Sequence, residues 1–350
     1  MYVGFRWGLV GLAITIKDVA KFAGVSVGTV SKVINKQGNV KDDIAVRVEA
    51  VIEKLNYRPS ALARSIKKNK TNLIGLIVPR VMNSFYVQLI ELIEKTMNGQ
   101  NYTLLLGNTG EDIQTEVKYL RSFADMRVDG LLLTSVGRSD WGKIRQELLA
   151  FEALGIPVVL VVRDLENARC DTVSIDNELG SFVATQHLIE NGHRRIGIIS
   201  SSAQTSASQE RINGYMNALS RHEIPIDLDL IKIGGTDLES GRQRTHEILD
   251  SENPPSALFV ASNFQLLGAF RALKEKNLSI PEELSLVCFD DTEWGMFVDP
   301  PLTVIKPNIE KLCETSTRFL LDRIQKKYQG APRHYRVKTT LVIRGSVNRA

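Results

Sequence analysis

The sequence has few of the features that mark secreted, metal-binding or membrane proteins. It contains three cysteines among 350 residues, and none of them belongs to a CxxC pair. This number and spacing are not those of a disulfide framework or a zinc knuckle. No uninterrupted apolar run reaches the roughly 18 residues that a membrane-spanning helix requires. We therefore expect a cytoplasmic protein that folds around ordinary hydrophobic cores and needs no metal or cofactor.

The motifs of several enzyme classes are also missing. Within residues 71–350 we find no GxGxxG after a predicted strand, and no GxxxxGK[ST], GxSxG or HExxH motif. The five histidines are scattered, and we interpret them as surface or capping residues: His187, His193, His222, His246 and His334. Without a catalytic constellation, the chain is predicted not to be an enzyme.

Positive charge is concentrated near the amino terminus. Residues 14–70 contain nine Lys and three Arg against three Asp and two Glu, a net charge of +7, whereas the whole chain carries only +4. A basic segment attracts a polyanion by releasing counterions, without sequence preference. A solvated lysine-rich surface would have the same composition. Charge alone therefore leaves both interpretations open.

Residues 14–58 have the hydrophobic periodicity of three short helices. Thr15 is predicted to cap the first helix, Gly24 to end it, and Ser26 to cap the second helix over VGTVSKVIN. A third helix opening near Asp42 carries an apolar face that can cover the first two. Helix, glycine-containing turn and helix form the helix-turn-helix pattern, whose second helix lies in the DNA major groove. A helical hairpin that packs on another surface is the alternative.

The next segment, residues 59–70, is expected to link this head to the rest of the chain. Its sequence RPSALARSIKK lacks glycine and is rich in alanine and leucine, so it can be helical. At about eight residues, a helix here is too short to be stable alone. We expect it to fold only on DNA, with a plain charged linker as the alternative. Residues 1–13 are expected to be an extension without stable structure.

From residue 71 onward, short apolar runs alternate with helical stretches. LIGLIVP, YTLLLGN, VDGLLLTS and PVVLVV are followed by RIGIISS, LIKIGG, SALFVAS and LSLVCFDD. Continuous hydrophobicity predicts parallel strands covered on both faces, which is an α/β fold. We expect two doubly wound lobes within 71–350, one from about 71–174 and 306–331 and the other from about 175–304 and 334–350. A ligand would bind at the carboxyl ends of the strands, between the lobes.

The two blocks TIKDVAKFAGVSVGTVSKVIN and LNYRPSALARS resemble the DNA-binding head of the LacI/GalR family, that of the lac, gal and purine repressors, and the resemblance runs from Thr15 to Arg344. It implies a body similar to periplasmic sugar-binding proteins. It also implies a transcription repressor that binds a palindromic double-stranded operator as a homodimer. A small polar effector between the lobes would control operator affinity. The chain shows no heptad tail, which favours a dimer over a tetramer.

The resemblance also assigns DNA contacts by position. Val27, Gly28 and Lys32 match base-reading positions, and Ile66 matches a leucine that wedges into the minor groove. Because Gly28 has no side chain, direct readout would fall on Val27 at a thymine methyl and Lys32 at guanine. The complete set implied is Thr15, Ser26, Val27, Gly28, Thr29, Ser31, Lys32, Asn35, Tyr57, Ser60, Ala63, Arg64 and Ile66.

Effector contacts are implied in the same way, for Arg80, Asn83, Phe85, Tyr86, Arg163, Arg211, Thr236, Ser262, Asn263 and Asp290. Each has a structural alternative: Arg211 could form a salt bridge, Asp290 could cap a helix, and the two aromatic residues could lie in the core. Thr236 stands where some relatives stack an aromatic ring on the ligand, which disfavours a purine. Arginines outnumber acids in this set, which favours a sugar acid or sugar phosphate, with a neutral sugar as the alternative.

Overall fold

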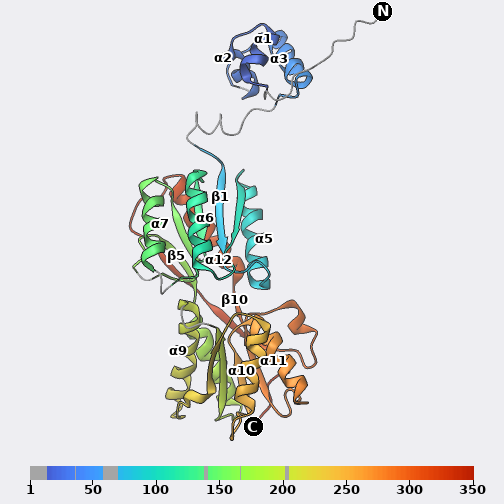
Figure 1. Ribbon diagram of the computed structural model, residues 1–350, viewed down its shortest axis with the longest axis vertical. Coiled ribbons are helices and arrows are strands. Elements are labelled where there is room, and N and C mark those ends of the chain that lie inside the picture. Colours follow the sequence, from blue (N-terminus) through green and yellow to red (C-terminus); the bar gives the residue numbers. More distant parts are fainter. Residues whose placement is uncertain (1–13, 36, 58–69, 138–140, 166, 202–204) are drawn as a thin grey trace, which may run out of the picture. The chain divides into compact units, whose positions relative to one another are not determined.

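The computed structural model describes residues 14–35, 37–57, 70–137, 141–165, 167–201 and 205–350 (Figure 1). The chain divides into two units, residues 1–71 and 72–350. The extension 1–13 and nearly all of the expected hinge lie outside the described residues, as do Ser60, Ala63, Arg64 and Ile66.

The head contains the three predicted helices, α1 (Ile16–Ala23), α2 (Val27–Ile34) and α3 (Asp42–Lys54). Gly24 ends α1 with a left-handed φ of +66°, a conformation that favours glycine. Ser26 caps α2, because its Oγ accepts a hydrogen bond of 3.1 Å from the backbone N–H of Thr29. The apolar faces of the three helices meet in one small core around Val19, Val30, Val33 and Val48.

The first lobe of the body is built on a six-stranded parallel sheet in the order β11-β5-β4-β3-β1-β2. Its strands are β1 (Leu73–Val78), β2 (Thr103–Asn108), β3 (Gly130–Leu133), β4 (Val158–Val162), β5 (Asp171–Ile175) and β11 (His334–Val337). Four helices cover it: α5 (Ser84–Asn98), α6 (Ile113–Asp125), α7 (Trp141–Ala153) and α12 (Ile309–Ile324). Because α5 contacts α12 while α6 contacts α7, the sheet is covered on both faces, as the apolar strands β3 and β4 require.

The second lobe contains a six-stranded sheet in the order β12-β10-β9-β8-β6-β7, in which only the β10–β12 pair is antiparallel. Its strands are β6 (Ile196–Ser201), β7 (Ile231–Gly234), β8 (Ala257–Val260), β9 (Ser285–Phe289), β10 (Thr303–Pro307) and β12 (Thr339–Val342). Four helices belong to it: α8 (Asn177–Glu190), α9 (Ser206–Arg221), α10 (Leu238–Leu249) and α11 (Asn263–Glu275). Two 3₁₀ turns, η1 (Leu228–Leu230) and η2 (Glu293–Met296), complete it.

One lobe boundary expected from the sequence is wrong. We expected residues from 334 onward in the second lobe, but β11 pairs with β5 in the first sheet, and the chain crosses only afterwards to β12. The physical reason is Asp171 at the start of β5. Its carboxylate accepts hydrogen bonds from the backbone N–H of Arg333 (2.8 Å) and from the Arg333 guanidinium (2.7 Å), which holds the next residues beside β5.

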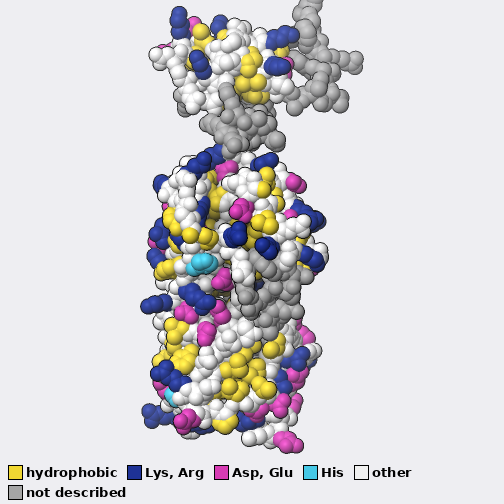
Figure 2. All heavy atoms as spheres, turned by 90° about the vertical axis from the view of Figure 1, so that its left-hand side faces the viewer, with side chains coloured by type: hydrophobic (Ala, Val, Ile, Leu, Met, Phe, Trp, Pro, Cys, Tyr) yellow, Lys and Arg dark blue, Asp and Glu magenta, His cyan; other side chains and the backbone are white. Residues whose placement is uncertain are grey.

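Within the ranges described above, no helix is both long and apolar enough to span a bilayer. Lys and Arg side chains occur together with Asp and Glu side chains on both lobes of the face shown in Figure 2. Mixed charge of this kind contrasts with the basic composition of residues 14–70. The net charge of +7 on residues 14–70 would attract a polyanion.

Candidate DNA-binding and effector-binding sites

The proposed base-reading residues lie on the exposed side of α2. Val27 is 41% exposed, Gly28 and Lys32 are exposed, and Val30 and Val33 on the opposite side are buried in the head core. Three exposed positions within two turns of one short helix form a surface that can enter a major groove.

Several other residues of the expected DNA-binding set have structural partners within the head. Thr15 donates from its hydroxyl (2.7 Å) and its backbone N–H (2.8 Å) to the Asp18 carboxylate, which fixes the start of α1. Asn35 donates from Nδ2 to the Ser31 carbonyl at 2.7 Å, at the end of α2. Tyr57 is half-buried and packs against the head core. These contacts fix the start of α1 and the end of α2 and contribute to the packing of the head.

In the body, nine of the ten expected effector residues line one crevice between the two lobes: Arg80, Asn83, Phe85, Tyr86, Arg163, Arg211, Thr236, Ser262 and Asp290. They come from segments that follow the carboxyl ends of β1, β4, β7, β8 and β9, and from α9. Parallel strands present their carboxyl ends at one edge, which is why residues far apart in sequence converge here.

The tenth residue, Asn263, has a different position. It is buried, and its Nδ2 donates to Asn83 Oδ1 (2.9 Å) and Ser84 Oγ (3.2 Å). Because Asn83 and Ser84 belong to the first lobe and Asn263 to the second, this amide bridges the lobes. It does not line the crevice.

Arg211 is held rigidly at the crevice wall. Its guanidinium lies 3.6 Å from the centre of the Phe289 ring, Nε donates to Asn177 Oδ1 (2.9 Å), and Nη1 donates to the Ala261 carbonyl (2.5 Å). Burial lowers the pKa of Arg211, while nearby Asp290 opposes that shift. Fixed on three sides, this group can present its remaining donors to a ligand without loss of side-chain freedom.

Two residues at the same edge have a left-handed backbone conformation. Val162 has a φ of +73° and Asp290 a φ of +74°, and both line the crevice. A left-handed conformation is rare for a β-branched residue and is found mainly where surrounding structure enforces it, as at binding sites. Burial raises the pKa of the Asp290 carboxyl, and its Oδ1 is buried without a hydrogen-bond partner.

Sequence reasoning missed part of the crevice wall: Glu111, Val162, Ile175, Ser201, Thr205, Ala207, Ser208 and Phe264. Glu111 matters most, because its carboxylate holds the Arg163 guanidinium at 2.9 and 3.1 Å. The charge count made from the sequence omitted this acid. Glu111 and Ser201 could have been found from their positions at or just after the ends of β2 and β6.

The crevice combines groups that a small polar ligand would satisfy. Arg80 Nε is a buried donor without a partner, and Asp290 Oδ1 is a buried acceptor without one. Phe85, Tyr86 and Phe264 add aromatic surface. Unpaired buried polar atoms are costly, so a ligand that both donates and accepts hydrogen bonds would be bound favourably. Among the described residues, no group of three or more His, Cys, Asp or Glu side chains could hold a metal ion.

Comparison with known proteins agrees with this organisation. Residues 15–60 match the model of the bacterial regulatory proteins of the lacI family, and residues 185–347 match that of the periplasmic binding protein-like domain. The HTH-type transcriptional repressor PurR of Aliivibrio salmonicida is 35% identical over 337 residues, covering 96% of this chain and 99% of that protein. The repressor PurR of Haemophilus influenzae is 37% identical over 336 residues, covering 95% of this chain and 98% of that protein.

Solved structures with similar folds point to the same family. The lac repressor dimer bound to operator and an anti-inducer has a TM-score of 0.83 at 26% identity, covering 96% of this chain and 100% of that one. The transcriptional regulator CelR in complex with cellobiose has a TM-score of 0.72 at 29% identity, covering 95% and 99%. This chain therefore belongs to the LacI family of bacterial regulatory proteins, and it is a DNA-binding transcription repressor, regulated by a small-molecule effector, and not an enzyme.

Proposed function

We propose that this repressor acts in the cytoplasm as a homodimer on a palindromic operator, and that its effector is a neutral, hydroxyl-rich molecule of the sugar class. The observation that carries the effector assignment is the crevice itself, with an unpartnered buried donor on Arg80, an unpartnered buried acceptor on Asp290, and aromatic surface. A hydroxyl group both donates and accepts, so a polyol can satisfy both atoms at once.

Operator reading is assigned to α2 and the hinge. Val27 and Lys32 contact base edges, while Ser26, Thr29, Ser31 and the ends of the head helices support the backbone contacts. Because α2 offers only two base-reading side chains, few direct base contacts are made, and the sequence-dependent deformability of DNA contributes more to operator specificity. Ser60, Ala63, Arg64 and Ile66 are assigned to the minor groove, where an apolar wedge kinks the duplex.

Effector binding and operator binding are coupled in this proposal because the effector crevice is lined by residues of both lobes. An effector contacts Arg80 and Tyr86 of the first lobe together with Arg211 and Asp290 of the second, so it favours one lobe arrangement over another. The Asn263–Asn83 hydrogen bond belongs to the arrangement described here and would change with lobe opening. Effector and operator then alter each other's affinity by the same factor.

The preference for a neutral sugar rests on Glu111. Of the three crevice arginines, Arg163 is neutralised by the bidentate Glu111 pair, and Arg211 faces the Asp290 carboxyl. Arg80 alone has no acidic partner among the lining residues, and its guanidinium carbon lies 5.6 Å from the centre of the Phe264 ring. The sugar acid or sugar phosphate expected from the sequence is therefore less favoured than the neutral alternative.

A flat heterocyclic base is the second candidate, because Phe264 supplies a ring in the second lobe that Thr236 does not. Titration calorimetry on the full chain separates the candidates, with a panel of neutral sugars, matched sugar acids and phosphates, and purine bases. Tight binding of neutral sugars supports the proposal, and binding confined to anions or to bases contradicts it. Selection of random duplex DNA with and without the bound sugar, at a stated salt concentration, then tests the operator assignment.

A further inference from the structure

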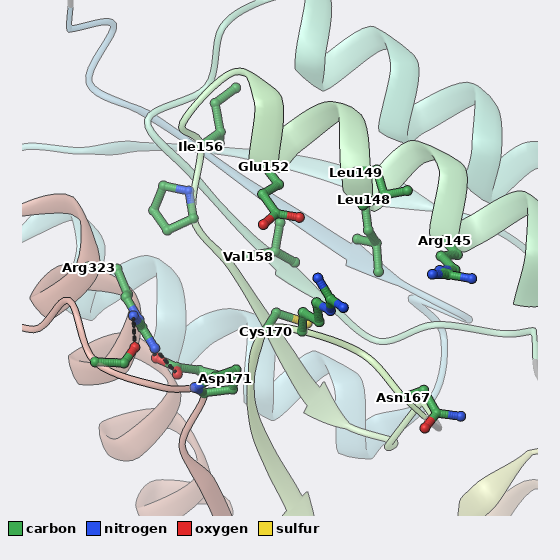
Figure 3. Close-up of a pocket in the computed structure, with 14 residues that line it drawn as sticks. Arg145, Leu148, Leu149, Glu152, Ile156, Val158, Asn167, Cys170, Asp171 and Arg323 are labelled. Atoms are coloured by element: carbon green, nitrogen blue, oxygen red, sulfur yellow. Dashed lines mark hydrogen bonds and ion pairs between the residues drawn. The ribbon is translucent and has the colours of Figure 1, made fainter.

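A second pocket lies on the flank of the first lobe and shares no lining residue with the crevice. It is formed by α7, the start of β4, the end of the β4–β5 connection and the segment between α12 and β11 (Figure 3). Its cavity volume is about 280 Å³, close to the lower end of the range of small-molecule sites.

The middle of this pocket is apolar and its two ends are polar. Leu148 on α7, Val158 on β4 and the Cys170 side chain lie between the ends in Figure 3. The Arg323–Asp171 pair occupies one end, and Arg145 and Asn167 lie at the other. A ligand that fits this arrangement has an apolar body and a polar head group.

The charge of the lining selects the sign of that head group. The Asp171 carboxylate is not available to a ligand, because it is buried and already binds two guanidinium groups, Arg323 and Arg333, each at 2.7 Å. Arg145 and Arg169, in contrast, have no ion pair or hydrogen bond with any residue that the structure describes. Glu152 is the single other acid in the lining, and it is exposed. Two unpaired arginines beside an apolar surface favour an anion.

We propose that this pocket is a second small-molecule site, and that it binds an amphipathic organic anion. Its apolar body lies over Leu148, Val158 and Cys170, and its carboxylate, phosphate or sulfonate group binds Arg145 and Arg169. The pocket shares no lining residue with the effector crevice, so the test of this proposal does not depend on whether the effector is a sugar.

Two fluorescent probes test the proposal on the full chain. 1-Anilinonaphthalene-8-sulfonate is an amphipathic anion, and N-phenyl-1-naphthylamine has the same apolar body without the sulfonate. The anion should bind about tenfold more tightly than the neutral probe, since charge-assisted hydrogen bonds to arginine are strong. The double variant Arg145→Gln/Arg169→Gln should lose about that factor for the anion and change by less than about twofold for the neutral probe.

Two controls test whether the affinity changes arise from a general loss of positive charge or from a loss of stability. Arg318→Gln removes an exposed arginine from α12 in the same lobe and should leave both affinities unchanged. Both arginines of the double variant are exposed and unpaired, so its thermal midpoint should equal that of the parent protein. If the thermal midpoint of the double variant is lower than that of the parent protein, the affinities for the two probes are measured again in Arg145→Gln and in Arg169→Gln separately.

Cys170 reports where the probe binds. It is half-buried, whereas Cys288 and Cys313 are buried, and burial raises the pKa of Cys170 to about 12, so alkylation by N-ethylmaleimide is slow and is followed over hours by peptide mass spectrometry. A saturating amount of the anionic probe should slow alkylation of Cys170 at least about fivefold, because the occupied pocket excludes the reagent. Unprotected Cys170, equal binding of the two probes, or unchanged anion affinity in the double variant overturns the proposal.

Discussion

Arg163 and Glu111 form a bidentate ion pair in the wall of the effector crevice, with Nη2 to Oε1 at 2.9 Å and Nη1 to Oε2 at 3.1 Å. Their side chains are only 11% and 22% exposed. Arg163 also donates to the Ser135 carbonyl at 3.2 Å. Both charged groups are largely desolvated, so each is stabilised mainly by the other. Removing one of them would leave a buried charge without an ion-pair partner.

Glu111→Gln should therefore convert the crevice into an anion site. Freed from its carboxylate, Arg163 should raise the affinity for a sugar acid or sugar phosphate by about tenfold relative to the matched neutral sugar, a change of about 1.4 kcal/mol. Calorimetry on both ligands measures the ratio. Glu147→Gln, which breaks the Arg121–Glu147 pair (2.8 Å) on the same lobe but outside the crevice, is the matched control. An unchanged ratio in Glu111→Gln would show that Arg163 does not face the ligand.

Lys32→Ala should relax operator specificity at one base pair in each half-site. Lys32 is exposed on α2 and can donate to a guanine in the major groove, a contact that contributes about 1 to 3 kcal/mol of discrimination. Competition binding with single-base operator variants measures it. Lys54→Ala, at the exposed end of α3, should at most weaken binding to all sequences equally. Identical base preferences in the parent protein and Lys32→Ala would remove this residue from the reading surface.

Two glycines of the head, Gly24 and Gly28, should respond oppositely to alanine. A Cβ on Gly28 would meet only Ser26 Oγ at 3.6 Å, so Gly28→Ala should stabilise the head by about 0.5 to 1 kcal/mol through helix propensity. Gly24 has a φ of +66°, so Gly24→Ala should destabilise it by about 1 kcal/mol or more. Urea unfolding followed by circular dichroism of full-length variants tests both. Equal effects would contradict the conformational argument.

The sequence predicts those features that depend on local signals. The helix caps at Ser26 and Gly24 lie within four residues of their partners, and strand ends are marked by abrupt changes from apolar to polar residues. That is why the three head helices and the two mainly parallel sheets were predicted from local patterns, whereas the nine crevice residues came from the resemblance to the LacI/GalR family. The individual roles of those residues remain predictions.

What the sequence could not predict depends on distant partners. Glu111 and Arg163 are 52 positions apart, and Asp171 and Arg333, whose contact places β11 in the first lobe, are 162 apart. Neither pair leaves a periodicity or a spacing that can be seen along the chain. Asn263 has the correct polarity for a ligand contact, but its place beside Asn83 follows only from how the lobes meet.

Gly268→Ala should be strongly destabilising, because α10 and α11 pack closely at this point. A Cβ at Gly268 would lie 2.0 Å from the Leu238 carbonyl oxygen and 2.4 Å from the Arg242 nitrogen, both of them backbone atoms. The helices would have to separate, at a cost of about 3 kcal/mol. Gly142→Ala is the control, since nothing lies within 4 Å of its Cβ position. Thermal unfolding of the two variants measures the contrast, and similar midpoints would refute the close-packing argument.

Glu116 should make the first lobe more stable in mild acid than at neutral pH. Its side chain is fully buried on α6, where burial raises its pKa from 4.5 to about 6, despite hydrogen bonds from Ser135 Oγ and the Val136 N–H at 2.7 Å each. The folded state therefore binds more protons than the unfolded state between about pH 4.5 and 6. The contribution of this group to the free energy of unfolding is largest below pH 4.5 and falls by about 2 kcal/mol as the pH rises through 6.

Glu116→Gln isolates that contribution, because the amide keeps the shape of the side chain but cannot ionise. Its Oε1 can accept from the Val136 N–H, and the Ser135 hydroxyl can rotate to accept from Nε2. The stability of the variant relative to the parent protein should therefore increase with pH, by about 2 kcal/mol between pH 4.5 and 7. Urea unfolding curves at four pH values across that interval give the difference directly. A difference that is constant with pH would mean that Glu116 is ionised equally in the folded and unfolded states, and that the hydrogen bonds from Ser135 and Val136 fully offset its burial.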